Sequence, residues 1–122
     1  ASECVKLLIQ KELKIKSSRA LILGFTFKEN CPDIRNTGVN LVREGLISYG
    51  LQVDVYDQNA DNYEVNKYYG FDLIDKPNGK YDLIVLAVAH KEFLNFDFDN
   101  LKHHETVTYD IKSVLSQFDK AL

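Results

Sequence analysis

The residues best suited to do chemistry lie in one polar stretch, residues 24–37, which contains Lys28 and Arg35. If a helix begins at the end of this stretch, its free backbone N–H groups favour an anion. Two cations beside them would strengthen binding of a phosphate or a carboxylate. The alternative interpretation is that the two cations are solvated or pair with Glu29 and Asp33.

Four further side chains in the chain have two interpretations each. Phe25 and Phe27 could offer a surface for a flat base, or one of them belongs to the core. Asp57 follows a stretch that alternates apolar and polar residues, where dinucleotide-binding folds place a ribose-binding acid. Because Gly24 lacks the further glycines of that fingerprint, a cap at the strand end is favoured. His90 is compatible with a general base or ligand contact and with a structural histidine.

Cys31 is the one candidate nucleophile, and the nearby cations would favour its thiolate. No histidine is near it in sequence, so we predict no catalytic residue in this chain. Asp97 and Asp99 are interpreted as solvated loop residues. His103 and His104 are adjacent and would point in different directions from a strand, and no Cys or carboxylate lies at metal-ligand spacing. We therefore predict no metal site.

Length and composition predict one globular domain, since the chain has 122 residues, 45% of them hydrophobic and 27% charged. The net charge of −3 disfavours a nucleic-acid partner. The longest apolar run, residues 83–89, is far shorter than the about 20 residues of a membrane span. No signal peptide is visible, so Cys4 and Cys31 are expected as free thiols in a reducing, cytoplasmic compartment.

Hydrophobic periodicity predicts an α/β fold, namely a Rossmann-like, doubly wound parallel sheet in three layers, preceded by a helix. Strands are expected at 20–24, 51–57, 71–74, 83–89 and 106–110, with a turn at 76–80. Helices are expected at 3–16, after 36 or 37 up to Gly50, and at 58–69; residues 90–101 fit a short helix or an irregular connection, and a short helix is expected at the C-terminus. Ligands of such sheets bind beyond the carboxyl ends of the strands, which here points to residues 24–37, 56–59, 87–93 and 110–113.

The helix that ends at Gly50 has an apolar face made of Val39, Val42, Leu46 and Tyr49, which we expect to face the core. Asn36 and Thr37 are the candidates for its N-cap.

Residues 24–37 also carry a motif, Gly-x-x-Phe-Lys followed by Asp-x-Arg, which here has the sequence Phe-Lys-Glu-Asn-Cys-Pro-Asp-Ile-Arg-Asn. This motif resembles the C-terminal UDP-binding domain of the UDP-glucose/GDP-mannose dehydrogenases. Residues 53–57, the run 81–93 and residues 109–112 resemble it as well, so the resemblance covers about residues 17–115. The sequence of this motif is similar to that of a subgroup of the family, whose members oxidise C6 of UDP-N-acetylhexosamines for capsular and O-antigen polysaccharides.

The resemblance implies an enzyme that converts a UDP-sugar to a UDP-uronic acid with two NAD, through a thioester on an enzyme cysteine. Phe27 and Lys28 match residues that contact the substrate, and Lys112 stands where many relatives place a substrate-holding Arg. The exchange of Arg for Lys removes the planar fork. Arg35 matches an arginine that reaches NAD.

The resemblance also implies a division into 1–16, the end of a linker helix, and 17–122, the UDP-binding domain. The glycine-rich NAD domain and the domain with the catalytic cysteine have no counterpart here, and Cys31 does not match that cysteine. The chain is therefore expected to be an inactive fragment of an enzyme that forms a homodimer or higher oligomer. The alternatives are a stand-alone nucleotide-binding regulatory module and a receiver-like or flavodoxin-like domain, the latter disfavoured because no acidic cluster follows the first strand.

Overall fold

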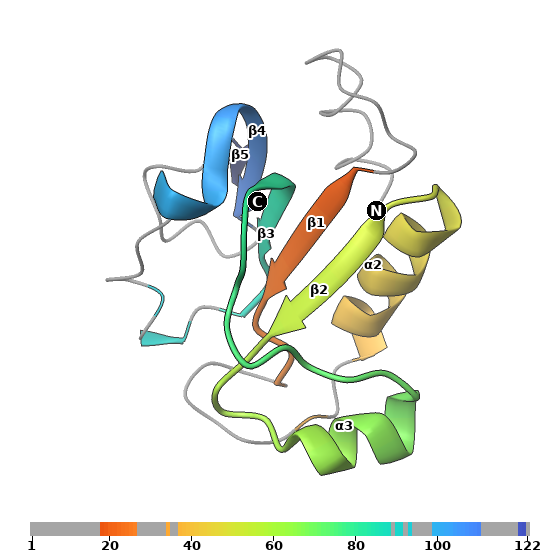
Figure 1. The fold of residues 1–122 in the computed structure, drawn as a ribbon. Helices are drawn as coiled ribbons and strands as arrows, with labels where there is room; N and C mark the ends of the chain where they lie inside the picture. Colours follow the sequence, from red (N-terminus) through yellow and green to blue (C-terminus); the bar gives the residue numbers. More distant parts are fainter. Residues whose placement is uncertain are drawn as a thin grey trace.

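The computed structural model describes residues 18–26, 34, 37–88, 90–91, 93, 99–110 and 120–121. These residues form a parallel sheet with the strand order β2-β1-β3-β4-β5 (Figure 1). The strands are β1 (Arg19–Leu23), β2 (Gln52–Tyr56), β3 (Tyr81–Leu86), β4 (Lys102–Asp110) and β5 (Lys120–Ala121). The chain places β2 on one side of β1 and β3 on the other, so the predicted α/β, doubly wound, Rossmann-like fold is confirmed.

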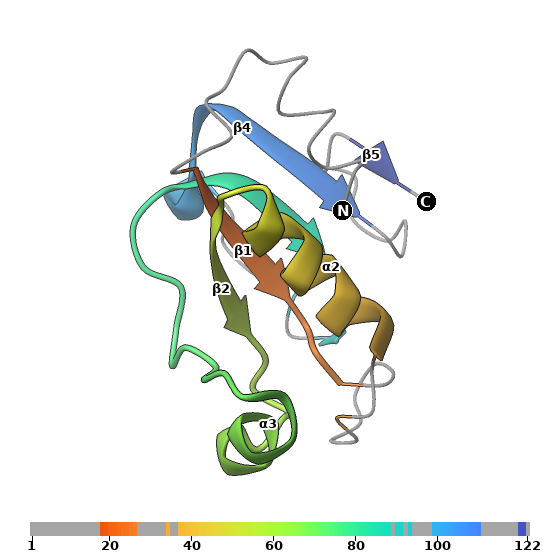
Figure 2. The same cartoon turned by 90° about the vertical axis from the view of Figure 1, so that its right-hand side faces the viewer.

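The two α-helices occupy different positions around the sheet. Helix α2 (Thr37–Ser48) lies over one face, whereas α3 (Asn62–Tyr69) lies beyond the carboxyl end of β2 (Figure 2). A 3-10 turn, η2 (Asp99–Leu101), leads into β4. The helix expected at 3–16 and the one expected after β4 lie outside the described residues, and the short strand β5 was not predicted.

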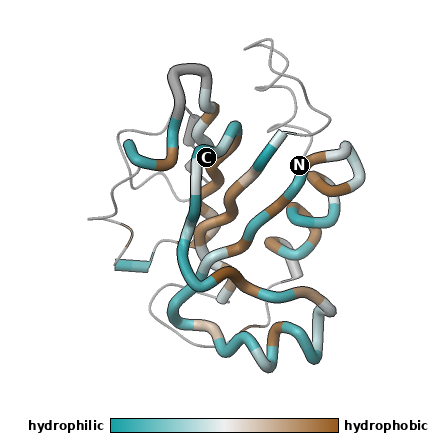
Figure 3. Tube along the Cα trace, viewed as in Figure 1, coloured by the Kyte–Doolittle hydropathy of each residue, from teal (hydrophilic) through white to brown (hydrophobic). Residues whose placement is uncertain are grey.

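Strands β1 and β3 are buried on both faces of the sheet. Successive side chains of a strand point to opposite sides, and in these two strands almost all of them are buried. Ile22 of β1 belongs to the cluster that α2 covers, while Leu21 and Leu23 belong to the cluster on the other face. Among the described residues, Phe93, Leu101 and Ile74 pack in that second cluster. Burial on both sides explains the nearly continuous apolar runs of β1 and β3, visible in Figure 3.

Helix α2 buries Val39 and Leu46 and packs Val42 against the core, as its periodicity predicts. The expectation for Tyr49 was wrong, since this residue is 47% exposed. The helix ends at Ser48, and Tyr49 lies in the turn that follows, in which Gly50 has a φ of +96°. Thr37 is the first helical residue, and Asn36 lies outside the described residues.

Helix α3 confirms the short helix expected at 58–69 and has sequence signals at both ends. The Asp61 side chain accepts a hydrogen bond from the N–H of Tyr63 at 2.9 Å, and Gly70 ends the helix in the left-handed conformation.

The strand expected at 71–74 does not form. This segment makes one backbone hydrogen bond to the outer side of β2, from the N–H of Ile74 to the carbonyl of Val55 at 2.9 Å. The Rossmann strand order has one more strand on the outer side of β2, and the order is otherwise the one seen here. Residues 71–74 lie in the place of that additional strand but do not form it.

The strand expected at 83–89 runs from Tyr81 and ends at Leu86 instead. The N–H groups of Ala87 and Val88 both donate to the carbonyl of Leu23, which turns the chain out of the sheet. Strand β4 begins at Lys102, four residues before the expected start, and its register with β3 shifts between Tyr81 and Leu83.

Candidate functional site

The carboxyl ends of β1, β2 and β3 meet where the direction of strand order reverses, the usual ligand side of an open parallel sheet. Gly24 follows β1 with a φ of +97°, and its N–H donates to the carbonyl of Tyr56 at 2.9 Å. A Cβ at position 24 would lie 2.6 Å from the Cβ of Val88 and 2.8 Å from its backbone N and O. Only glycine therefore allows this approach of the turn after β1 to the turn after β3.

The Asp57 side chain joins the ends of all three strands. Its Oδ2 accepts hydrogen bonds from the N–H of Phe25 at 2.6 Å and of Thr26 at 3.0 Å, and lies 2.9 Å from Nε2 of His90. Its Oδ1 accepts from the N–H of Asn59 at 2.8 Å. Asp57 is therefore a cap at the strand end, as its sequence context favours, and its carboxylate is engaged with protein groups instead of facing a ribose.

The hydrogen bonds to Asp57 outweigh the cost of burying it. Burial by itself would raise its pKa, but the hydrogen bonds from His90 and from the N–H groups of Phe25 and Thr26, with the charge interaction with His90, lower the pKa below its ordinary value of 3.8. Asp57 is thus a carboxylate at neutral pH.

His90 is completely buried and lies between two partners. Its Nε2 lies 2.9 Å from Oδ2 of Asp57 and 2.9 Å from Oγ1 of Thr26. Because the carboxylate can only accept, the proton sits on Nε2, and the Thr26 hydroxyl accepts from the same N–H. Of the two interpretations of His90, this geometry favours the structural histidine.

Phe25 belongs to the core and does not offer a surface for a base. It is fully buried and packs edge-on against Tyr69 and Phe71, with ring centroids 4.9 and 5.3 Å away. The Tyr69 hydroxyl in turn donates to the carbonyl of Ile34 at 2.8 Å. These contacts connect α3 to the polar stretch between β1 and α2.

The residues predicted to bind substrate or cofactor, Phe27, Lys28, Arg35 and Lys112, lie outside the described residues, as does Cys31. Their described neighbours are informative: Thr26 immediately precedes Phe27, and β4 ends at Asp110. Strands β1, β3 and β4 are neighbours and parallel, so their carboxyl ends lie at one edge of the sheet.

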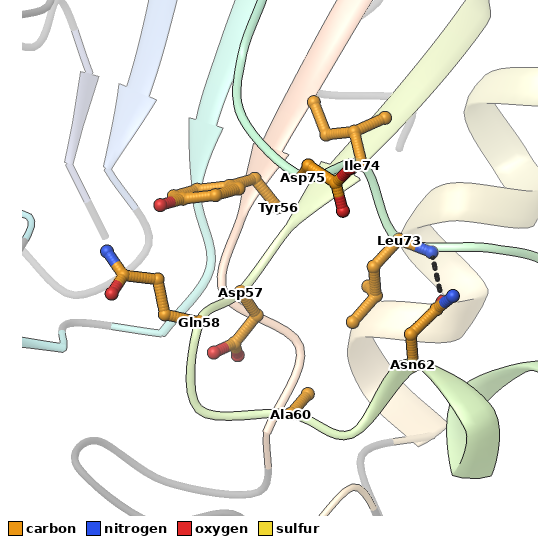
Figure 4. A pocket seen from close by; sticks show the side chains of 8 residues that line it. All are labelled: Tyr56, Asp57, Gln58, Ala60, Asn62, Leu73, Ile74 and Asp75. Atoms are coloured by element: carbon orange, nitrogen blue, oxygen red, sulfur yellow. Dashed lines mark hydrogen bonds between the residues drawn. The ribbon is translucent and has the colours of Figure 1, made fainter.

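A small pocket of about 170 Å³ lies beside the carboxyl end of β2 (Figure 4). Its lining residues are Tyr56, Asp57, Gln58, Ala60, Asn62, Leu73, Ile74 and Asp75. No Lys or Arg is among them, and ligand pockets usually exceed about 300 Å³, so this pocket is not the expected anion site.

The sequence pointed to only part of this pocket. Residues 56–59 follow a predicted strand, but residues 73–75 reach it because the N–H of Leu73 donates to Oδ1 of Asn62 at 2.7 Å, across 11 positions (Figure 4). No spacing in the sequence signals such a contact.

Within the described part of the chain, no group of three or more His, Cys, Asp or Glu side chains could hold a metal ion. No helix there is long and apolar enough to cross a membrane.

The fold and the polar network at its carboxyl edge define a Rossmann-like α/β domain with its ligand side at the point of strand reversal. Residues 21–117 match the model of the UDP-glucose/GDP-mannose dehydrogenase family, UDP binding domain. The chain belongs to this family, and the resemblance noted in its sequence is confirmed.

Curated relatives match almost the whole chain. It is 41% identical over 121 residues to the UDP-N-acetyl-D-glucosamine 6-dehydrogenase of Pseudomonas aeruginosa and 40% identical over 119 residues to Protein CapL of Staphylococcus aureus. Each match covers 95% of this chain and 28% of the relative. The UDP-N-acetyl-D-glucosamine 6-dehydrogenase of Salmonella typhi is 38% identical over 119 residues. The chain thus spans little more than a quarter of the length of these relatives.

Solved structures share the fold. An NDP-N-acetyl-D-galactosaminuronic acid dehydrogenase from Methanosarcina mazei superposes with a TM-score of 0.77 at 24% identity, over 91% of this chain and 24% of that one. A UDP-D-ManNAc dehydrogenase from Pyrococcus horikoshii gives a TM-score of 0.71 at 20% identity, over 98% and 29% of the two chains.

Proposed function

We propose that this chain is the UDP-sugar-binding domain of an NAD-dependent UDP-sugar 6-dehydrogenase, which oxidises C6 of a UDP-N-acetylhexosamine or of UDP-glucose to the uronic acid for surface polysaccharide synthesis. The observation that carries the proposal is 41% identity, over 95% of the chain, to a UDP-N-acetyl-D-glucosamine 6-dehydrogenase. The domain alone would bind the nucleotide sugar without oxidising it.

In this proposal Phe27, Lys28 and Lys112 contact the UDP-sugar. Residues 27–28 directly follow the capped turn after β1, and Lys112 comes two positions after the end of β4, so both groups belong to segments that leave the ligand side of the sheet. A lysine near C6 suits a substrate that gains negative charge there, because a point charge needs no bidentate geometry.

NAD does not fit the described part of this domain. The turn after β1 lacks the second and third glycines of the dinucleotide fingerprint. Asp57, which stands where a ribose-binding acid would, is buried and holds four protein N–H groups. We therefore assign NAD to another part of a longer enzyme, with Arg35 reaching it from this domain.

The remaining parts of the proposal concern the whole enzyme. Residues 1–16 would end a linker helix, and residues 17–122 would be the UDP-binding domain. The enzyme would be a cytoplasmic homodimer or higher oligomer. These features are inferred from the family resemblance.

Calorimetric titration of the 122-residue chain with UDP, UDP-N-acetylglucosamine and NAD tests the proposal. We expect saturable, weak binding of both uridine nucleotides, because half a pocket leaves much of the ligand in water. Lys28→Ala should weaken the binding of UDP-N-acetylglucosamine and leave that of UDP unchanged, because Lys28 is placed near the sugar. Lys76→Ala, which removes an exposed cation elsewhere, should change neither. Absence of uridine nucleotide binding, or tight binding of NAD alone, would contradict the assignment.

A further inference from the structure

Three segments far apart in the sequence are connected at one buried point beside the proposed ligand site. Asp57 follows β2, His90 follows β3, and Thr26 lies in the turn after β1. The side chains of Asp57 and His90 are completely buried, and Thr26 is 0% exposed. A buried polar network of this kind specifies one local geometry, since each group left unpaired is costly.

The network holds main chain as well as side chains. Oδ2 of Asp57 accepts from two consecutive backbone N–H groups, those of Phe25 and Thr26, at 2.6 and 3.0 Å. The Thr26 hydroxyl, 2.9 Å from Nε2 of His90, adds a side-chain contact to the same turn. Phe25 and Thr26 immediately precede Phe27 and Lys28 in the chain.

The histidine is itself held by the end of β3. Its N–H donates to the carbonyl of Val88 at 3.0 Å, and its carbonyl accepts from the N–H of Phe93 at 3.0 Å. Its ring packs at 5.7 Å from that of Phe93. Because Gly24 is packed against Val88 on the other side of this turn, the ends of β1 and β3 cannot shift independently.

We propose that Asp57, His90 and Thr26 are positioning residues for the ligand site, a positioning triad that fixes the backbone of Phe25 and Thr26 so that the following Phe27 and Lys28 meet the UDP-sugar. The inference rests on the proposed function for its ligand. The restraint on the turn after β1 can be measured without one.

The test compares His90→Leu, which removes the shared N–H at similar volume, with His90→Gln, which keeps a donor near the position of Nε2. Arg19→Ala is the matched control, because Arg19 connects several elements at the opposite edge of the sheet. Two quantities are measured on each folded variant: hydrogen exchange of individual amides and the Kd for UDP-N-acetylglucosamine.

Exchange decides whether the triad holds the turn. In His90→Leu we expect the amides of Phe25 and Thr26 to exchange about tenfold faster, while those of Ile22 and Val85 in the sheet stay unchanged. In His90→Gln all four should stay close to the parent values. If the role of His90 were merely structural, His90→Leu would accelerate exchange of the turn amides and of the sheet amides together, as we expect for Arg19→Ala. That result, or unchanged exchange in His90→Leu, would overturn the proposal.

Binding decides whether the restraint serves the ligand. We expect His90→Leu to raise the Kd for UDP-N-acetylglucosamine about tenfold, the factor that corresponds to one hydrogen bond of ordinary strength, and His90→Gln to raise it by less than about threefold. Arg19→Ala should leave the Kd unchanged. An unchanged Kd in His90→Leu would overturn the positioning role. Failure of the parent chain to bind UDP-N-acetylglucosamine would instead contradict the proposed function, while the exchange data would still decide whether the triad holds the turn.

Discussion

Asp57 illustrates how one side chain can be polar, buried and stabilising at once. Its sequence position suggested a ribose contact or a cap, and its four hydrogen bonds make it a cap. A carboxylate in this position exchanges hydration for donors fixed by the backbone, and such charge-assisted bonds are among the stronger ones in proteins.

Asp57→Asn should destabilise the domain by about 1 to 3 kcal/mol at neutral pH, because the amide NH2 would face buried donors. The effect should depend on pH. The folded-state pKa of Asp57 lies below 3.8, so its carboxylate contributes full stability above that value and loses the contribution as pH falls through the lower folded pKa.

Urea denaturation from about pH 7 to about pH 3 measures this effect. The gap between parent and Asp57→Asn should be largest at neutral pH and shrink below about pH 4. Asp75→Asn, which removes an exposed carboxylate, is the control. A gap that is constant over the whole range would contradict the role given to the charge.

At the scale of elements, Arg19 at the amino end of β1 connects this strand to the segment that precedes β3. Its guanidinium donates to the carbonyls of Lys80 at 2.9 Å and Asn78 at 2.8 Å and lies over the Tyr81 ring, 4.3 Å from its centroid. The Tyr81 hydroxyl donates to Asp54 at 2.7 Å. Burial, together with this hydrogen bond to a carboxylate, raises the pKa of Tyr81. These contacts anchor the connection that crosses from α3 to β3.

Arg19→Ala should lower the free energy of unfolding by about 1 to 2 kcal/mol, a modest loss because the guanidinium is partly exposed and water can replace it. Arg19→Lys should recover only part of this loss, since an ammonium cannot reach both carbonyls and stack on the ring. Midpoints of urea denaturation give both values, with Lys76→Ala as the control. Equal midpoints for Arg19→Ala and the parent would disprove the anchoring role.

The elements were predictable where the local pattern and the tertiary environment agree. Strands β1 to β4 follow from apolar runs and alternation, α2 from its periodicity and end signals, and α3 from a polar stretch with several tyrosines. The segment 71–74 has the pattern of a strand, but it makes one backbone hydrogen bond to β2 and has no further partner strand in the described part of the chain. Strand β3 stops at Leu86 although its apolar run continues, because packing against Gly24 redirects the chain.

The site was predictable in location but not in connectivity. The rule about carboxyl strand ends points to residues 24–37, 56–59 and 87–93, and the network lies there. That Asp57 pairs with His90 across 33 positions follows only from the order of the strands, which local spacing does not reveal.

At the scale of the whole molecule, the chain covers 28% of relatives named as dehydrogenases, so its contribution to a reaction is best tested in a longer enzyme. In such an enzyme, Lys28→Ala should lower kcat about 100-fold or more with a smaller change in KM, because the cation would act on charge that develops at C6. Steady-state kinetics with UDP-N-acetylglucosamine and NAD measure this. A raised KM with unchanged kcat would show that Lys28 binds substrate and transition state equally.

The position of β1 between β2 and β3 also has a consequence for folding during synthesis, when the strands leave the ribosome in chain order. β1 precedes both of its neighbours in the chain, and it is paired on both edges only after β2 and then β3 have been synthesised. Until Leu86 has emerged, one edge of an apolar strand is open to other chains, which is a hazard for aggregation. Truncations that end before Tyr81 should therefore be insoluble, because they lack β3, the strand that pairs with this edge of β1 and lies at the centre of the finished sheet.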